Sequence, residues 1–414
     1  MAKAAAETAV GKKMKLSNPN FPDTFGIAEA VVTGLNPQAQ ALRFAVNAEA
    51  DKPMGTASIA SCLGLVIALI SDKKVKMKLL SFLGFQSTED LLSLKDPCRV
   101  LSVLLSSVAY TALKNAPSGP ECHQLWEAVG AKCISLETNL ETQLNTMLKK
   151  AWNIEEDTFK PFSIVPEASV KDLIAALVSI EKIEVSWKKE LDFYELKPFT
   201  TATGEKVDGM FCIDKTHRLM NTLTFDGGEA VLLPCQADDK TGKERGMVFL
   251  LPPENDQNLD NSLKALANYM DKTMNGLKFD PCCKVNFSFP AFDVTMQPAT
   301  IVPYLKPFIP EIFDKMSGCM DGTLPREEID GVAYIGDVQH GASIKADRKG
   351  ATAKAVTVAT VLTFRSLPPP PKQFHCNRPF VSILVELIPG TVDVKNIEFV
   401  TKHETAASLD LTVN

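Results

Sequence analysis

Residues 350–371 read GATAKAVTVATVLTFRSLPPPP, a run of alternating residues followed by Phe-Arg-Ser and four prolines. A period of two places each alternate set on one face of a β-strand. One set is almost uniformly small: Ala351, Ala353, Ala355, Thr357, Ala359 and Val361. Small side chains on one face suit a crowded slot between existing strands, whereas prolines supply no amide donor and cannot join a ladder. The stretch therefore predicts a segment that can become a strand but is held short of one.

The bulk composition is that of an ordinary globular protein. The chain has 414 residues, of which 45% are hydrophobic and 23% charged. Its net charge of −6 argues against a general nucleic-acid binder, which would present a basic face. We therefore expect no nucleic-acid partner.

The apolar segments argue against a membrane partner. The opening residues, MAKAAAETAVGKK, lack the apolar core of a signal peptide, so we expect a cytoplasmic protein, with an extracellular one as the alternative. The most apolar run, ASIASCLGLVIALI at 57–70, is shorter than the roughly 20 residues that span a bilayer. We expect it to form a buried core helix.

Motifs for metal binding or catalysis are missing from the sequence. The 10 cysteines show no CxxC spacing, which favours buried thiols over a disulfide framework. The 5 histidines are dispersed and none has HxxxH spacing, so we expect no metal site. No GxSxG, GxxxxGK[ST] or GxGxxG occurs. We therefore expect neither an enzyme nor a cofactor.

The chain changes character at about residue 170. Before that point helical spacing dominates, at 58–83, 98–114, 121–135 and 136–152. After it, strand-like runs recur, such as KVDGMFCI, EAVLLPCQ, GMVFLLPP and KVNFSFPAFDV. Helices collected early and strands collected late predict an α+β fold with large sheets. With no linker in sight, we expect one domain over 20–404, an N-terminal extension over 1–19 and a tail over 405–414.

The C-terminal third resembles the serpin family. The resemblance rests on VNFSFPAFDV, on GVAYIGDVQHGASIKADRKGATAKAV and on FHCNRPFVSILVE. Eight residues fit the order and spacing of the family's fifth strand, hinge and R-P-F block: Asp337, Val338, His340, Gly350, Phe374, Arg378, Pro379 and Phe380. Upstream, GMVFLLPPEN and GTASIASCLGLVIAL are similar to two further family motifs.

This resemblance implies a fold and a mechanism. The fold would be α+β, with helices packed around three β-sheets and an exposed reactive loop that can insert into the main sheet. The function would be inhibition of a serine protease as a suicide substrate, by a monomeric protein that needs no cofactor. The hinge and loop would occupy 346–372, with the hinge formed by Arg348, Gly350, Ala351, Ala353, Ala355 and Thr357.

The resemblance also assigns residues that control sheet opening. Ser58, Ser179 and His340 would form the shutter, and Trp187 would lie at the breach, the upper end of the main sheet. Two departures from the family pattern concern this control. Ser179 replaces an asparagine, and Arg348 stands where the family usually has a glutamate.

Two bonds are candidates for the reactive bond. Fifteen residues counted from Gly350 give Phe364–Arg365, whereas counting back from the R-P-F block gives Arg365–Ser366. We favour Arg365, which suits a trypsin-like protease. Phe364 would suit a chymotrypsin-like protease, and a cysteine protease that accepts arginine is a further candidate. The alternative function is a non-inhibitory carrier or chaperone whose loop is a simple substrate.

Overall fold

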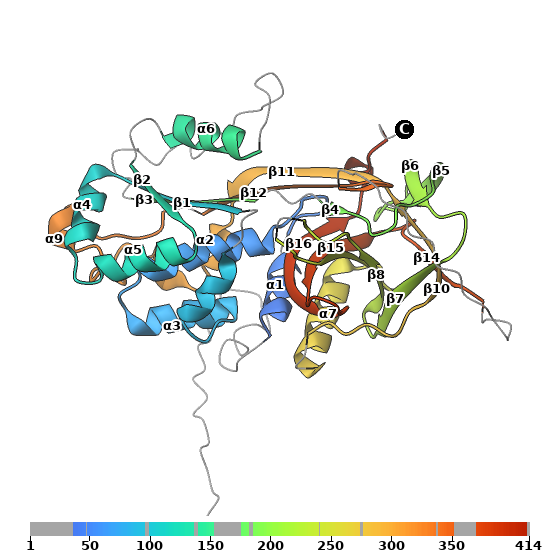
Figure 1. Ribbon diagram of the computed structural model, residues 1–414, viewed down its shortest axis with the longest axis horizontal. Helices are drawn as coiled ribbons and strands as arrows, with labels where there is room; N and C mark the ends of the chain where they lie inside the picture. Colours follow the sequence, from blue (N-terminus) through green and yellow to red (C-terminus); the bar gives the residue numbers. More distant parts are fainter. Residues whose placement is uncertain are drawn as a thin grey trace, which may run out of the picture.

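The computed structural model describes residues 36–46, 48–95, 99–135, 140–152, 175–181, 185–239, 241–273, 276–336, 338–351 and 370–411 (Figure 1). The described helices are α1 (Pro37–Val46), α2 (Thr56–Leu69), α3 (Lys73–Leu83), α4 (Ser107–Asn115), α5 (Gly119–Ala128), α6 (Leu140–Trp152), α7 (Leu259–Thr273), α8 (Val302–Leu305) and α9 (Arg326–Ile329). Short 3-10 helices are η2 (Glu89–Leu94), η5 (Pro310–Phe313) and η6 (Ala406–Ser408).

Strands dominate the second half of the chain. Those before the longest helix are β1 (Arg99–Leu105), β2 (Lys132–Ser135), β3 (Ala175–Glu181), β4 (Val185–Ser186), β5 (Phe193–Thr200), β6 (Lys206–Ile213), β7 (Arg218–Phe225), β8 (Gly228–Pro234) and β9 (Arg245–Leu251). Those after it are β10 (Cys283–Pro290), β11 (Phe292–Thr300), β12 (Gln339–Ala346), β13 (Gly350–Ala351), β14 (Lys372–His375), β15 (Phe380–Leu387) and β16 (Val394–His403).

Two of these strands were expected to be helical. Residues 99–105 form β1, which pairs in parallel with β2 and antiparallel with β3. The sequence RVLSVLL is rich in β-branched and branched apolar residues, and a short apolar run of this kind does not distinguish a buried strand from a helix. Tertiary pairing decides it here. The helical expectation for 98–114 and 121–135 was therefore wrong over 99–105 and 132–135.

One continuous run of strands has the order β16-β15-β9-β8-β7-β10-β6-β5. Strand β7 changes partner half-way, because Arg218–Met220 pair with β10 while Asn221–Phe225 pair with β8. The run therefore divides into two sheets. We call β16-β15-β9-β8-β7 the rear sheet.

A third group of strands lies over helix α2. It consists of β2-β1-β3 and of the pair β11-β12, and we call these two parts together the main sheet. Figure 1 shows β1, β2 and β3 above α2, with β11 and β12 extending across to the rear sheet. The architecture is α+β, as the sequence predicted, with the described strands in these sheets and in the short pair β4-β13.

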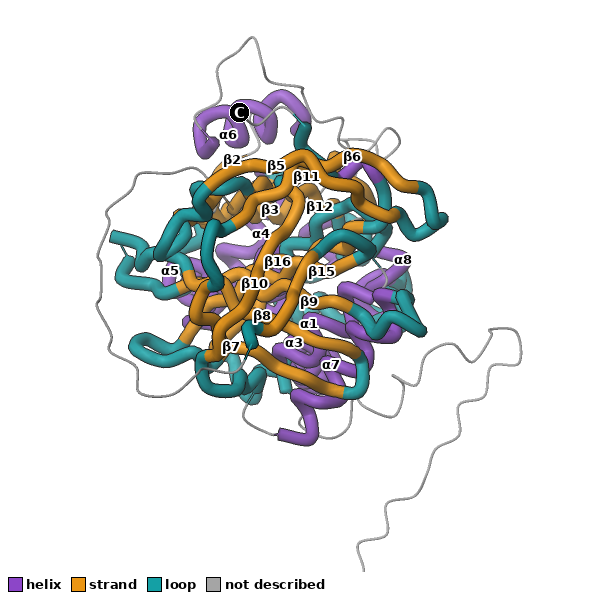
Figure 2. Tube along the Cα trace, turned by 90° about the vertical axis from the view of Figure 1, so that its right-hand side faces the viewer, coloured by secondary structure: helices purple, strands orange, loops and turns teal. Residues whose placement is uncertain are grey.

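Three apolar clusters hold these layers together. One packs α1 and α7 on the rear sheet, through Leu42, Leu263 and Val248, and Figure 2 shows these helices along one side of the strands. A second lies between the rear sheet and β11-β12, and it includes Phe249 from β9 and Ile344 from β12. The third surrounds α2, of which all but two residues are buried. The expected buried core helix is confirmed, with bounds 56–69.

Candidate functional site

A tight turn follows β12 and occupies Asp347–Gly350; we call it the hinge turn. The amide of Asp347 donates to the carbonyl of Gly350 at 3.1 Å. One Asp347 carboxylate oxygen accepts from the amides of Lys349 at 2.7 Å and Gly350 at 3.1 Å. Gly350 has a φ of 129°, a conformation that side chains with a Cβ rarely adopt. The sequence thus closes a two-residue hairpin loop after β12.

The hinge turn is attached to Ser186–Leu191, which we call the docking segment. Three successive carbonyls of the turn accept its hydrogen bonds. Asp347 accepts from the Trp187 indole at 2.8 Å, Arg348 from the Leu191 amide at 2.9 Å, and Lys349 from the Trp187 amide at 3.2 Å. The Trp187 side chain is fully buried and packs edge-on against a phenylalanine of β10. Trp187 therefore binds the turn through both its backbone and its side chain.

Strand β13 continues this attachment. Gly350 pairs with Ser186 and Ala351 pairs with Val185, in antiparallel register. The last residue of the turn and the residue after it are thus already paired with β4, the strand that follows β3 in the chain.

The three predicted shutter residues meet at the start of α2. The hydroxyls of Ser58 and Ser179 are 3.3 Å apart. His340 Nε2 accepts a hydrogen bond from the backbone amide of Gly55 at 3.0 Å. The contacts tie β3 and β12 to the same helical turn. Because the ring of His340 is buried, desolvation lowers its pKa to about 4, so it is neutral at physiological pH.

The edges of β3 and β12 are not paired with each other in the described part of the chain. There, β3 pairs with β1, and β12 pairs with β11. Both strands nevertheless reach the first turn of α2 through Ser179 and His340. Ser179 and His340 thus bring β3 and β12 to the same end of α2, although the described residues do not pair these two strands with each other.

Comparison with known proteins bears directly on this arrangement. A family model described as serpin (serine protease inhibitor) matches residues 162–392, which is more than half of the chain. The chain belongs to the serpin family. Over 142 residues this serpin is 34% identical to serine protease inhibitor 88Ea of Drosophila melanogaster, which covers 34% of this chain and 31% of that protein. The match therefore spans about a third of the curated relative.

Solved serpin structures share the fold over most of their length. AtSerpin1 of Arabidopsis matches with a TM-score of 0.66 and 15% identity, over 89% of this chain and 96% of that one. The thermophilic serpin tengpin matches with a TM-score of 0.67 and 14% identity, over 94% and 96%. Human thyroxine-binding globulin matches with a TM-score of 0.63 and 14% identity, over 89% and 98%. At these identities the likeness shows the fold alone.

The departure at Arg348 has a local explanation in this serpin. Its guanidinium donates to the Leu191 carbonyl at 3.1 Å and lies 3.6 Å from a Glu190 carboxylate oxygen. It also lies over the Tyr194 ring, 5.7 Å from the centroid, a cation–π arrangement. Desolvation raises the pKa of the Tyr194 hydroxyl. An arginine at this position is thus held by a carboxylate and a ring of the adjoining segment.

Sequence reasoning missed three partners at this site. Glu190 and Tyr194 both contact the Arg348 guanidinium, and the run KKELDFY after Trp187 carried a signal in its two acids, which lie close in sequence to a residue that pairs with the basic hinge. Gly55 is the third. A Cβ there would lie 3.1 Å from His340 Cε1, so glycine permits the close approach of the ring. His340 was expected to form a hydrogen bond near Ser58 and Ser179, and its partner in the structure is the Gly55 amide, at the start of the same helix.

Several predicted residues lie outside the described residues. These are the hinge positions Ala353, Ala355 and Thr357 and the candidate reactive-bond residues Phe364, Arg365 and Ser366. Their assignments stay predictions.

Other expectations concern thiols, metals and membranes. Five of the described cysteines are buried, two are half-buried and two, Cys133 and Cys282, are exposed, and all nine are free thiols. Burial raises the pKa of the Cys122 thiol to about 12. Within the described ranges, no cluster of His, Cys, Asp and Glu side chains could hold a metal ion. Within the same ranges, no helix has the length and apolar character to cross a bilayer.

Proposed function

We propose that this serpin inhibits a serine protease as a suicide substrate, with a reactive loop that inserts between β3 and β12 after cleavage. The observation that carries the proposal is the register at which the hinge turn is attached. The register can be extended from the hinge turn in two independent ways, by pairing the loop with β3 and by pairing it with β12.

The first pairing begins on the docking segment. Gly350 lies opposite Ser186 and Ala351 lies opposite Val185. Extended without a bulge for seven residues from Gly350, this antiparallel register places Thr357 opposite Ser179.

The second pairing begins at the hinge turn itself, which joins Asp347 to Gly350. Seven residues forward from Gly350 is Thr357, and seven residues back from Asp347 is His340. A hairpin extended from this turn therefore places Thr357 opposite His340. Both registers bring the same residue to the shutter, between two strands that already contact the start of α2.

The register also explains the small alternate set. Residues directly opposite each other in an antiparallel pair point to the same face of the sheet. Ser179 and His340 both point to α2, so Thr357 would point there too. The residues that share its face are Ala351, Ala353, Ala355, Ala359 and Val361. Small side chains fit that face because α2 closes it, whereas Lys354 would point away from the helix.

The chemistry then follows from the fold. The residue before the reactive bond is here called the bait residue. The serine of the target protease attacks its carbonyl carbon, the amine of the next residue leaves, and an ester joins the two proteins. The freed loop enters the main sheet as a strand. Fifteen residues at about 3.3 Å each would carry the attached protease about 50 Å. Displacement on that scale would separate the protease from the leaving segment before hydrolysis of the ester.

The target class rests on the bait residue. Arg365 followed by Ser366 favours a trypsin-like protease, and Phe364 followed by Arg365 would favour a chymotrypsin-like one. The alternative function is a carrier, and the fold match to thyroxine-binding globulin complexed with its ligand is the observation that favours it.

The test is incubation with trypsin and, separately, with chymotrypsin, followed by denaturing gels and mass spectrometry. We expect an SDS-resistant complex and a released peptide that begins at Ser366 for an arginine bait, or at Arg365 for a phenylalanine bait. Clean cleavage without a complex, together with an unchanged melting temperature of the cleaved protein, would overturn inhibition and favour the carrier.

A further inference from the structure

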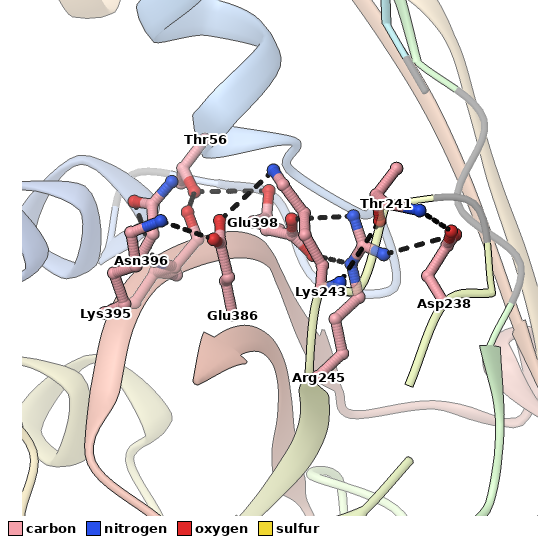
Figure 3. A network of polar contacts seen from close by, with 10 residues as sticks. Thr56, Asp238, Thr241, Lys243, Arg245, Glu386, Lys395, Asn396 and Glu398 are labelled. Carbon is pink, nitrogen blue, oxygen red and sulfur yellow. Dashed lines mark hydrogen bonds and ion pairs between the residues drawn. The ribbon is translucent and has the colours of Figure 1, made fainter. Parts of the chain in front are cut away.

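A buried ion pair joins two strands of the rear sheet that are not neighbours. Arg245 begins β9 and Glu398 lies on β16, with β15 between them. Arg245 donates from Nε to Glu398 Oε2 at 2.8 Å and from Nη2 to Oε1 at 3.2 Å (Figure 3). Their side chains are 2% and 1% exposed. Removing two charges from water is costly, so a buried pair is better evidence of a fixed geometry than of added stability.

The backbone of β16 is adapted to this contact. The register with β15 shifts between the pairs Leu384–Phe399 and Val385–Ile397, which makes Glu398 the extra residue of a bulge. A bulge re-aims a side chain within a sheet. The bulge allows the Glu398 carboxylate to reach Arg245 across the intervening strand.

The Glu398 end of the pair contacts the start of α2. The hydroxyl of Thr56 donates to the carbonyls of Ile397 at 2.8 Å and Glu398 at 3.3 Å (Figure 3). Thr56 is the first residue of α2 and is followed two residues later by Ser58. The bulge therefore fixes the helical turn on which the shutter is built.

The Arg245 end contacts the support of the docking segment. The Arg245 carbonyl accepts from the amide of Cys235 at 2.9 Å. On either side of Cys235, the Pro234 carbonyl accepts from the Lys188 amide at 2.9 Å, and the Gln236 amide donates to Ser186 at 2.7 Å. The docking segment, to which the hinge turn is attached, is thus hydrogen-bonded to the two neighbours of Cys235, the residue that pairs with Arg245.

We propose that Arg245 and Glu398 are a positioning pair that couples the shutter to the hinge turn. Strands β3 and β12 also run between these two places, but under the proposed function they are the strands that would part. The ion pair joins β9 and β16 of the rear sheet, outside those two strands, and would hold the two places in fixed relation. Its role in loop insertion rests on the proposed function, whereas the coupling itself does not.

The test is amide hydrogen exchange in the uncleaved protein, with S58A as the perturbation. S58A removes the Ser58–Ser179 contact. In the parent protein we expect it to speed exchange in the docking segment, residues 186–191, about fivefold. In the R245M/E398L background we expect the same change to leave exchange there within about twofold of its value without S58A. E398Q keeps the size of the side chain but removes its charge, and it replaces the double variant if that does not fold. In the E398Q background the effect of S58A on exchange in residues 186–191 should be smaller than in the parent.

The matched control is E386Q. Glu386 lies on β15 in the same polar network, is 8% exposed and pairs with Lys243 and Lys395 (Figure 3). In the E386Q background the S58A effect on residues 186–191 should persist. Propagation that survives R245M/E398L, or that is missing in the parent, would overturn the coupling. Because the measurement needs no protease, a serpin that traps nothing can still show the coupling, and one that traps can fail to show it.

Discussion

The rear sheet and the main sheet use their strands in opposite ways. Strands β9 and β15 are buried along their whole length and are paired on both sides, so the rear sheet is complete. The main sheet is divided, and its inner strands β3 and β12 each have one partner in the described part of the chain. Under the proposed function, the further strand would be gained between β3 and β12, and the rear sheet would keep its strands as they are.

The largest expected effect comes from blocking the place where that strand would enter. T357R would put a charged side chain on the face that meets α2, next to Ser179 and His340, so trapping should be lost while cleavage continues. V356R, on the opposite face, is the matched control and should still trap. The fraction of protease in SDS-resistant complex measures both. Equal trapping by the two variants would contradict the register.

Acid should destabilise the shutter through His340. Its folded pKa of about 4 lies below the unfolded value of about 6.5, so the unfolded chain binds more protons between these limits. Stability is therefore present above pH 6.5 and falls by about 3 kcal/mol as the pH drops to 4. Urea unfolding at several pH values measures the loss. H340Q can still accept from the Gly55 amide and should flatten the dependence; a slope as steep as that of the parent would assign the loss to other groups.

Matched valine truncations compare the two sheets directly. Val248 on β9 is 0% exposed and Val178 on β3 is 9% exposed. V248A should lower the free energy of unfolding by about 2–3 kcal/mol, because two methyl groups and the cavity they leave cannot be refilled between two complete strands. V178A should cost about half as much, since the edge of β3 can relax. Urea unfolding midpoints of both variants measure the two losses, and equal losses would contradict the difference between the sheets.

The smallest effect concerns the hinge turn. Arg348 and Glu190 are 25% and 28% exposed, so solvent screens their attraction, and R348E should weaken the docking by about 1 kcal/mol. Faster amide exchange in residues 186–191 measures the weakening. The swap R348E/E190R should restore the parent rate. K349E makes the same change of charge one residue away and should have little effect; loss of protection equal to that in R348E would indicate a general charge effect.

The sequence predicted the parts of the molecule that local pattern determines. The helix over 56–69 and the late strands followed from periodicity. The resemblance to serpins singled out Gly350, where the structure has a tight turn. Strand β1 was missed because a short apolar run has no period of its own and takes its conformation from β2 and β3.

The site could be predicted only for residues that belong to a recognisable sequence motif. His340, Ser58 and Ser179 could be placed near one another from their motifs, and the structure brings them together at the start of α2. Glu190, Tyr194 and Gly55 could not, because each acts through a partner far away in the sequence. The Arg245–Glu398 pair could not be predicted for a further reason. It depends on a β-bulge, and the spacing of residues in the sequence does not indicate where a bulge forms.

The residues that precede and follow 352–369 are both paired with other strands. Before this stretch β13 pairs with β4, and after it β14 pairs in parallel with β10 from Lys372 to His375. Hydrolysis of one peptide bond between these two pairings would leave two chain ends on different sheets. Under the proposed function, insertion would draw those ends far apart, and no protease could rejoin them. Each molecule would then serve once, so its supply would depend on new synthesis and not on turnover.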